Sequence, residues 1–446
     1  MAPLPESVVT YARKKLLDLV SIPSVSAEGR GLEQAAQAVA EMLRELGLEA
    51  SLHPTNGAPV VFAEGGGTGP TILFYNHYDV QPADPLEDWA SDPFTLLEKD
   101  GNLYGRGTHD DKGELVARLA ALLWVKQEHG QLPFRVKFVV EGEEETGSPN
   151  LPGYVESHRE LLKSDAVLWE AGGTDAKGRP QAYCGLKGIL AVELRTKTAG
   201  YDLHSSYGAV VQNPIYRLSL AIASLRDNQG KVLIKGFYDQ VRALSKVEAD
   251  ALKTLPDESA ELAKIFGVKG YMGGVQGESF YHKLLAEPCV NVNGFHSGYG
   301  GPGSKTVLPA EAYAKLDFRL VPDQEPAEVF RLLQEHLQRE GFEDIELSYL
   351  EAGEQPSRSD LSHPWVKTAL EALREVYQKD PVLYINMAGS GPMHPFTDVL
   401  KAPVVGFGVG YPGSKVHSPN EHIRVADFEQ GIVAIKRALE MFAARF

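Results

Sequence analysis

Short, continuously apolar runs alternate with amphipathic stretches in the first part of this chain. The runs Thr71–Tyr75, Phe134–Val140 and Ala166–Trp169 are typical of strands that are buried on both faces, as in the interior of a parallel sheet. Between the first two, Glu114–Lys126 has the apolar spacing of a helix with one buried face. This alternation predicts a doubly wound α/β sheet, which needs helices on both of its faces.

Beyond Gly185 the pattern is that of a compact α+β domain. Strands are expected at 189–196, 312–321 and 345–349, and helices at 214–225 and 326–339. Residues 238–286 are charged and weakly patterned, and no element is assigned to them. After a polar, turn-rich stretch at 351–360, a helix at 364–378 and a strand at 402–409 return to the α/β pattern. We therefore predict a catalytic domain in two segments, 1–184 and 355–446, interrupted by an inserted domain at 185–354.

Composition narrows the class of protein. The net charge of -16 argues against a nucleic-acid partner and against an anionic membrane surface, because no basic stripe is available. The two cysteines, Cys184 and Cys289, lie far apart and without CxxC spacing, which excludes a disulfide framework and a cysteine zinc site. No apolar run is long enough to span a bilayer or to form a signal peptide. A cytoplasmic location is expected.

Acidic and histidine residues gather near the ends of the apolar runs, where the active sites of open α/β sheets form. Imidazoles and carboxylates are the ligands that a pair of divalent ions requires, with one carboxylate left over as a base. The segments are 77–79, 110–112, 143–145, Glu170 and His417. Together they predict a two-metal site.

Two residues that follow the run at 71–75 could share this site. In an extended segment, side chains two positions apart point the same way, so His77 and Asp79 reach one space. His77 could bind a metal through one ring nitrogen, while Asp79 accepts the proton of the other nitrogen. For this pair alone, a loop histidine bonded to a nearby aspartate is an equally good interpretation.

The acidic segments at 110–112 and 143–145 each leave an alternative. Asp110 can present two oxygens and so bridge two metals, but Asp110 or Asp111 could instead simply cap the helix that follows. The glutamates at 143–145 repel one another, so their clustering is costly without a cation, and an exposed acidic turn is the weaker interpretation. Glu170 and His417 would complete two coordination spheres, although either alone could be an ordinary loop residue.

Two competing motifs fail on their context. Residues 298–303 match GxGxxG, but Pro302 and the strand-like residues beyond Thr306 deny that stretch the helix of a dinucleotide site. Ser390 follows Ala388 and Gly389, so the GxSxG elbow of a serine hydrolase is not formed.

With their neighbours, the acidic and histidine segments resemble the M20 family of di-zinc metallopeptidases, and most closely its carnosine-dipeptidase-like branch. The resemblance covers most of the chain. Its motifs lie at 76–82, 104–113, 141–148, 202–205, 303–309 and 317–322. It implies a catalytic domain of the zinc-exopeptidase type, a lid and dimerisation role for the inserted domain, a homodimer, and two divalent ions per chain, Zn²⁺ first, with Mn²⁺ or Co²⁺ as alternatives.

The resemblance also implies a role for each residue. One metal would be bound by His77, Asp110 and Glu170, and the other by Asp110, Glu145 and His417. Glu144 would be the general base, Asp79 would orient His77, and His204 would reach the partner subunit's active site to stabilise the tetrahedral oxyanion. Arg319, Thr306 and Ser390 would hold the free carboxylate of the substrate, since a guanidinium can grip it through two hydrogen bonds. From the residues alone, Arg319 is an exposed strand residue of the lid.

The activity implied is hydrolysis of the amide bond of a dipeptide or short peptide by a water between the two metals, with Glu144 as base. In the family, dipeptidases usually have aspartate where Glu170 stands, whereas glutamate is commoner in the carboxypeptidase and desuccinylase branches. An N-acyl-amino-acid hydrolase, desuccinylase or carboxypeptidase is therefore the neighbouring alternative, and a non-catalytic metal-binding protein is the more distant one.

Overall fold

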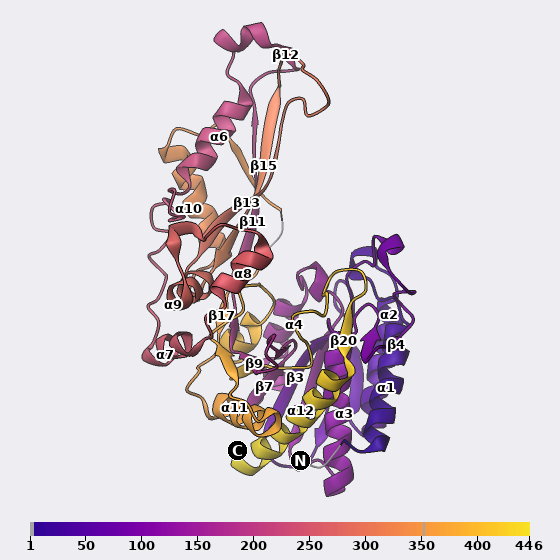
Figure 1. Ribbon diagram of the computed structural model, residues 1–446. Helices are drawn as coiled ribbons and strands as arrows, with labels where there is room; N and C mark the ends of the chain where they lie inside the picture. The colour runs from indigo at the N-terminus through magenta and orange to yellow at the C-terminus, as the bar shows by residue number, and fades with distance from the viewer. Residues whose placement is uncertain (1–3, 351–352) are drawn as a thin grey trace.

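The fold consists of a large α/β domain from which a smaller, elongated domain projects (Figure 1). A computed structural model describes residues 4–350 and 353–446, so two residues of the polar stretch at 351–360 lie outside the described part. The chain leaves the large domain next to β10 (Gly185–Leu186) and returns next to β17 (Ser357–Arg358), and these two short strands pair with each other. The two segments that connect the domains therefore lie side by side.

The large domain is built on a nine-stranded sheet. Its order is β1-β2-β6-β3-β7-β19-β9-β18, with β8 paired to β9. The strands are β1 (Glu49–His53), β2 (Val60–Gly66), β3 (Thr71–His77), β6 (Arg135–Glu141), β7 (Ala166–Trp169), β8 (Gly173–Thr174), β9 (Pro180–Tyr183), β18 (Val382–Tyr384) and β19 (Val404–Gly406). Because β6, β3, β7 and β19 run parallel, their carboxyl ends meet at one edge of the sheet.

Both faces of this sheet are covered, as β3 illustrates. Ile72 and Phe74 belong to one apolar cluster, whereas Leu73 and Tyr75 belong to another on the opposite face. The first cluster includes α1 (Glu6–Val20), α2 (Leu32–Glu45), α3 (Lys112–His129), α11 (Pro364–Tyr377) and α12 (Val425–Arg445); the second includes α4 (Leu151–Ser157), α5 (Arg159–Leu162) and the turn η7 (Pro395–Val399). The predicted doubly wound α/β architecture is confirmed. The strand expected at 402–409 is shorter than predicted, since only Val404–Gly406 pairs.

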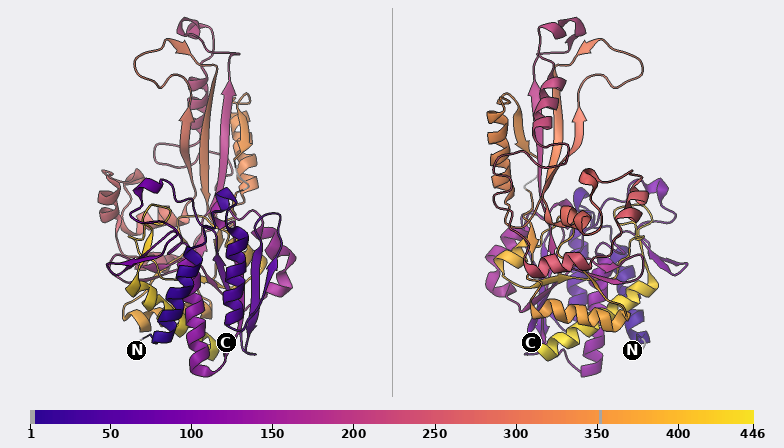
Figure 2. Two further views of the ribbon diagram at one scale, coloured as in Figure 1. Left: turned by 90° about the vertical axis from the view of Figure 1, so that its right-hand side faces the viewer. Right: turned by 60° about the vertical axis from the view of Figure 1, so that its left-hand side comes forward.

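The projecting domain, called the lid below, is an antiparallel sheet with two helices. Its order is β13-β15-β11-β16, formed by β11 (Gly188–Lys197), β13 (Cys289–His296), β15 (Glu311–Leu320) and β16 (Glu346–Tyr349). The helices α6 (Pro214–Ser224) and α10 (Pro326–Arg339) pack on it and bury a separate core. At its far tip, β12 (Leu203–His204) pairs with β14 (Val307–Leu308), and both views of Figure 2 show this tip standing clear of the large domain.

The weakly patterned stretch at 238–286 contains helices that pack away from the lid core. They are α7 (Lys246–Thr254), α8 (Ser259–Phe266) and α9 (Gly277–Tyr281). Leu252, Phe280 and Tyr281 belong to the apolar cluster of the large domain. The division of the chain at 184 and 354 therefore stays a prediction.

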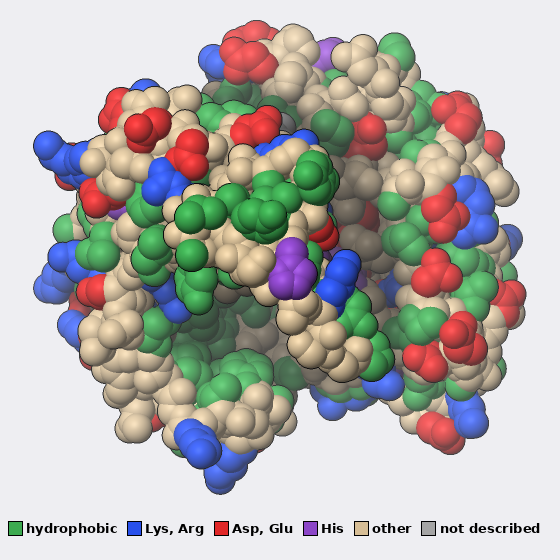
Figure 3. Space-filling view, turned by 90° about the horizontal axis from the view of Figure 1, so that it is seen from above, with side chains coloured by type: hydrophobic (Ala, Val, Ile, Leu, Met, Phe, Trp, Pro, Cys, Tyr) green, Lys and Arg blue, Asp and Glu red, His purple; other side chains and the backbone are tan. Residues whose placement is uncertain are grey.

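No helix in the described ranges combines the length and the apolarity that crossing a membrane requires. Figure 3 shows the molecule from above, from the side on which the lid projects. On this face acidic and basic side chains are interspersed, and the surface is hollowed beside the lid.

Candidate metal centre

His77, the last residue of β3, lies at the carboxyl edge of the large sheet and is buried. Its Nδ1 lies 3.1 Å from the backbone carbonyl oxygen of Asp79 and 3.2 Å from Oδ1 of the same residue, which is also buried. Asp79 additionally accepts hydrogen bonds from the backbone N–H groups of Glu144 and Glu145, at 3.2 and 3.1 Å. One carboxylate thus holds both the imidazole of His77 and the turn that carries two of the candidate glutamates.

Asp110 lies between the two candidate histidines. Its Oδ1 is 3.1 Å from Nε2 of His77, and its Oδ2 is 2.8 Å from Nε2 of His417. The predicted segment at 110–112 does not follow a strand of the large sheet. It follows β5 (Asn102–Tyr104), which belongs to a separate three-stranded sheet with β4 (Leu97–Lys99) and β20 (His422–Arg424). Two oxygens aimed at two imidazoles are the geometry that a carboxylate bridging two metals needs.

The side chain of Asp111 does not cap the helix α3 that follows it, which was one of the alternatives for this residue. It is the N-cap residue of α3, yet its side chain makes no capping hydrogen bond. Instead its Oδ2 accepts from Nδ2 of Asn76 at 2.7 Å and from the backbone N–H of His77 at 3.0 Å. Asp111 also has a carboxylate oxygen within metal-ligand distance of His77 and Glu170, although its Oδ2 accepts these two hydrogen bonds. Asp110 is the carboxylate that faces the imidazoles on both sides.

The remaining candidates converge on the same place from the carboxyl ends of β6 and β7. Glu170 directly follows β7, and its Oε2 lies 3.7 Å from Nε2 of His77. Oε2 of Glu145 lies 3.1 Å from Nε2 of His417. Glu144 stands back, with its Oε2 4.0 Å from Nε2 of His77. The structure therefore brings all five predicted ligands and the predicted base together.

Two oxygens in this cluster show that the donor set suits cations. Oε1 of Glu145 and Oε2 of Glu170 are buried and have no hydrogen-bond partner among the described residues. An unpartnered buried carboxylate oxygen is costly unless a cation binds it. The groups His77, Asp111 and Glu170, and Asp110, Glu145 and His417, each have ligand atoms close enough to share one ion. Imidazole nitrogens with carboxylate oxygens suit zinc and other first-row divalent ions.

Burial and mutual charge shift the protonation of these groups. Burial raises the pKa of Glu144 and Glu170 well above the ordinary carboxyl value, and it also raises the pKa of Glu145. Burial opposes the charge of His77, but the carboxylates of Glu170 and Asp110 outweigh it and raise its pKa well above the ordinary value. Hydrogen bonds to Asp110 and then Glu145 raise the pKa of His417 to about 10. Metal binding here must displace these protons, so it becomes more favourable as pH rises.

Glu421 supports the loop that carries Asp110, and no sequence motif singled it out. Its carboxylate accepts hydrogen bonds from the backbone N–H groups of His109 and Asp110, at 3.0 and 3.1 Å, and from Nη1 of Arg106 at 2.7 Å. Glu421 lies four positions after His417, so one loop supplies a candidate ligand and also supports the bridging carboxylate. The only sequence signal was its place in the segment around His417.

The predicted substrate and oxyanion residues fall into two groups. Nη1 of Arg319 on β15 donates to Oγ of Ser390 at 2.9 Å, which joins the lid to the large domain. Thr306 and His204 lie together at the opposite end of the lid, where the backbone N–H of Ser205 donates to the Thr306 carbonyl oxygen. Figure 1 shows β12, which carries His204, far from the edge of β3. Within one chain, Thr306 does not join Arg319 and Ser390.

A sheet edge that gathers imidazoles and carboxylates around Asp110 has the residue types found at the centres of metal-dependent hydrolases. The chain belongs to the Peptidase family M20/M25/M40, whose family model matches residues 73–441. The chain is thus an M20 metallopeptidase, as the sequence motifs predicted.

Three similar proteins illustrate the family. The structure of the M20 family metallo-carboxypeptidase Sso-CP2 from Sulfolobus solfataricus superposes with a TM-score of 0.91, at 40% identity, over 97% of this chain and 99% of that one. The beta-Ala-His dipeptidase of Rattus norvegicus is 30% identical over 84% of this chain and 77% of its own length. The cysteinylglycine-S-conjugate dipeptidase of Corynebacterium striatum is 30% identical over 90% of this chain and 88% of its own length.

Proposed function

We propose that the chain is a two-metal peptidase that hydrolyses the amide bond of dipeptides or short peptides. The observation that carries the proposal is the placement of Asp110, with Oδ1 3.1 Å from His77 and Oδ2 2.8 Å from His417. The dipeptidases of Rattus norvegicus and Corynebacterium striatum support a dipeptide substrate, while Sso-CP2 supports the carboxypeptidase alternative.

The proposed metal ligands are His77, Asp110 and Glu170 for one ion, and Asp110, Glu145 and His417 for the other. Zn²⁺ is the first candidate, with Mn²⁺ and Co²⁺ as alternatives, because all three accept nitrogen and oxygen ligands. When bound, such ions polarise the scissile carbonyl and lower the pKa of water.

Glu144 is the proposed general base. It lies within 4.0 Å of His77 without belonging to either ligand group, so its carboxylate is available for a proton. The raised proton affinity that burial imposes on it suits a group that takes a proton from the attacking water and passes it to the leaving amine. The carbon–nitrogen bond of the amide breaks, and a carboxylic acid and an amine leave. Asp79 keeps His77 in the orientation and tautomer this requires.

Arg319 and Ser390 are the proposed binding groups for the substrate carboxylate. Their 2.9 Å hydrogen bond places a guanidinium where the lid meets the large domain, and Asp317, 3.4 Å from Nε of Arg319, restrains its other side. A guanidinium with free N–H groups can hold a carboxylate through two parallel hydrogen bonds. Thr306 would join them only from a second chain.

A homodimer accounts for the positions of His204 and Thr306 at the far tip of the lid. β13 is an edge strand of the lid sheet, and Val292 and Phe295 on it are exposed. An exposed edge strand with apolar side chains can pair with the same strand of a second chain. In that arrangement His204 would reach the partner subunit's active site and stabilise the oxyanion. A reducing compartment, the cytoplasm, suits two cysteines that form no disulfide.

The test is Glu144→Ala, with Glu143→Gln as the matched control. Glu143 is the neighbouring carboxylate, and its Oε2 accepts from Nδ2 of Asn150 at 2.6 Å, outside the proposed ligand groups. Glu144→Ala should abolish peptide hydrolysis and keep about two metals per chain, whereas Glu143→Gln should stay active. Substantial hydrolysis by the Glu144→Ala variant would show that Glu144 is not the general base.

A further inference from the structure

Glu114 and Arg118 form a buried ion pair on α3, and the proposed reaction uses neither residue. Nη1 of Arg118 donates to Oε2 of Glu114 at 2.8 Å, and neither side chain is more than 1% exposed. The space around the pair is tight, since a Cβ atom added at Gly408 would lie 2.0 Å from Oε1 of Glu114. Burying two charges is costly, so a buried ion pair is weak evidence for a purely stabilising role. The contacts that this pair makes with other segments point to a different role.

The pair binds the ends of two neighbouring parallel strands. Nη2 of Arg118 donates to the carbonyl oxygens of Trp169 at 2.7 Å and Phe407 at 3.4 Å. Trp169 is the last residue of β7, and Phe407 directly follows β19. Oε1 of Glu114 accepts a hydrogen bond from the backbone N–H of Val409 at 2.8 Å. One charged pair thus joins α3 to the carboxyl ends of β7 and β19.

The backbone on both sides of Glu170 is constrained. On one side, the Trp169 carbonyl accepts the hydrogen bond from Arg118. On the other side, Ala171 has a φ of 62°, a left-handed conformation that a residue with a side chain adopts when its surroundings impose it. Arg118 therefore acts on the peptide that leads directly into a proposed metal ligand.

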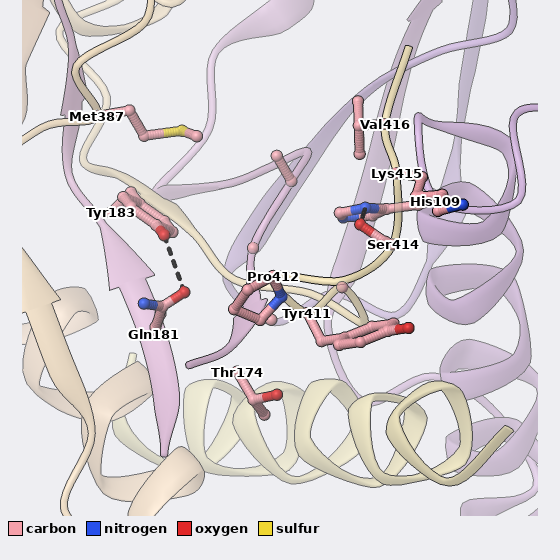
Figure 4. Close-up of a pocket in the computed structure, with 14 residues that line it drawn as sticks. His109, Thr174, Gln181, Tyr183, Met387, Tyr411, Pro412, Ser414, Lys415 and Val416 are labelled. Carbon is pink, nitrogen blue, oxygen red and sulfur yellow. Dashed lines mark hydrogen bonds between the residues drawn. The ribbon is translucent and has the colours of Figure 1, made fainter. Parts of the chain in front are cut away.

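Two other proposed ligands, Asp110 and His417, have supports of their own. Glu421 accepts hydrogen bonds from the backbone N–H groups of His109 and Asp110. Nδ1 of His109 lies 2.8 Å from Oγ of Ser414, which is three positions before His417. Figure 4 shows these two side chains together on one side of a cavity of about 530 Å³. Loss of the ion pair on α3 should therefore leave Asp110 and His417 joined.

We propose that Glu114 and Arg118 are positioning residues for Glu170. They thereby set the affinity of the ion that Glu170 binds, and they affect the ion that His417 binds much less. A merely stabilising pair would act on both ions equally, through the stability of the whole domain. This inference rests on the proposed metal ligands, and it adds two residues that touch neither metal nor substrate.

The experiment measures the Kd of Co²⁺ for the metal-free chain by isothermal titration calorimetry in two backgrounds. His417→Ala leaves the site of the Glu170 ion, and Glu170→Gln leaves the site of the His417 ion. Arg118→Lys keeps the charge but lacks the planar fork that reaches the Trp169 carbonyl and Glu114 together. We expect it to raise the Kd about tenfold or more in the His417→Ala background, and about twofold or less in the Glu170→Gln background. An equal change in the two backgrounds, or none in either, overturns the inference.

Arg358→Lys is the matched control. The side chain of Arg358 is only 2% exposed and is paired with Glu248 at 3.1 Å, and neither residue belongs to the proposed ligand groups. This control should lower the melting temperature and leave both Kd values nearly unchanged. A selective rise of the same size in the control would overturn the inference.

Glu114→Gln replaces Arg118→Lys if that variant does not fold. Its amide oxygen can still accept from Val409, but its NH₂ group then faces Arg118, so the pair is broken and the same selective rise in Kd is expected. An equal rise in both backgrounds would again overturn the inference. Fewer than two Co²⁺ per unsubstituted chain would instead refute the proposed function itself, and the inference with it.

Discussion

Glu421→Gln should disturb the metal centre without removing a ligand. The Glu421 carboxylate is fully buried, and its Oε1 accepts from the backbone N–H groups of His109 and Asp110 at 3.0 and 3.1 Å. Its Oε2 accepts from Nη1 of Arg106 at 2.7 Å and from the backbone N–H of Gly107 at 3.1 Å. One side chain thus determines where the loop presents the Asp110 carboxylate.

The magnitude follows from those four contacts. Glutamine has the size of glutamate but replaces one acceptor oxygen with an NH₂ group, so two of the four donors lose their acceptor. Arg106, which is 1% exposed, also loses its buried counterion. Hydrogen bonds to charged groups are worth about 1.5–3 kcal/mol each. Removing one partner of a buried ion pair costs about 3–5 kcal/mol. Because the lost hydrogen bonds are part of this ion-pair cost, the two values are not added, and we expect the free energy of unfolding to fall by about 3–5 kcal/mol.

Chemical denaturation followed by circular dichroism, with metal titration of the folded protein, measures both consequences. Glu98→Gln is the matched control, because Glu98 is paired with Arg13 at 2.7 Å with its side chain 51% exposed. Such surface pairs contribute about 0–1 kcal/mol. We expect Glu421→Gln to be much less stable than this control and to bind metal more weakly. If both variants unfold at the same denaturant concentration and bind two ions equally tightly, Glu421 does not position the Asp110 loop.

Three further predictions concern other parts of the chain. Arg319→Lys should raise KM at least tenfold for substrates with a free C-terminal carboxylate and change kcat little, because lysine cannot form the two parallel hydrogen bonds; an unchanged KM in steady-state kinetics would argue against this site. With a disulfide reagent at pH 8, one thiol per folded chain should react, since Cys289 is exposed, whereas burial raises the pKa of Cys184 to about 12; two reactive thiols before unfolding would contradict this. Burial lowers the pKa of Lys187 from 10.5 to about 8, so the unfolded chain binds more protons between these values and stability should rise with pH across that window. Lys187→Met should lack this rise in thermal melts, and parallel pH profiles of the two proteins would refute the assignment.

The local spacing of apolar residues in the sequence was enough to predict many of the strands and helices. The apolar run at 71–75 buries alternate residues on opposite faces, which is the property its composition indicated. The helix at 326–339 has the bounds that its periodicity predicted. By contrast, the helices between 246 and 281 were not predicted, because their apolar residues form no clear period and pack on distant elements of the large domain. β13 was not predicted either, although Val290 and Val292 alternate with asparagines.

For the metal centre, the sequence by itself determined the residue types and the chemistry they can support, because ligand preference is a property of the side chain. From the local residues alone, Asp110 or Asp111 could equally cap the following helix, and it was the family resemblance that named Asp110 as the ligand. The tertiary structure turns Asp111 toward Asn76 and Asp110 toward both imidazoles. It also brought His417 to Asp110 across 307 positions and buried Glu421 beneath the same loop. Such contacts depend on the order of the strands in the sheet and on how distant segments of the chain come together, which no local sequence pattern encodes.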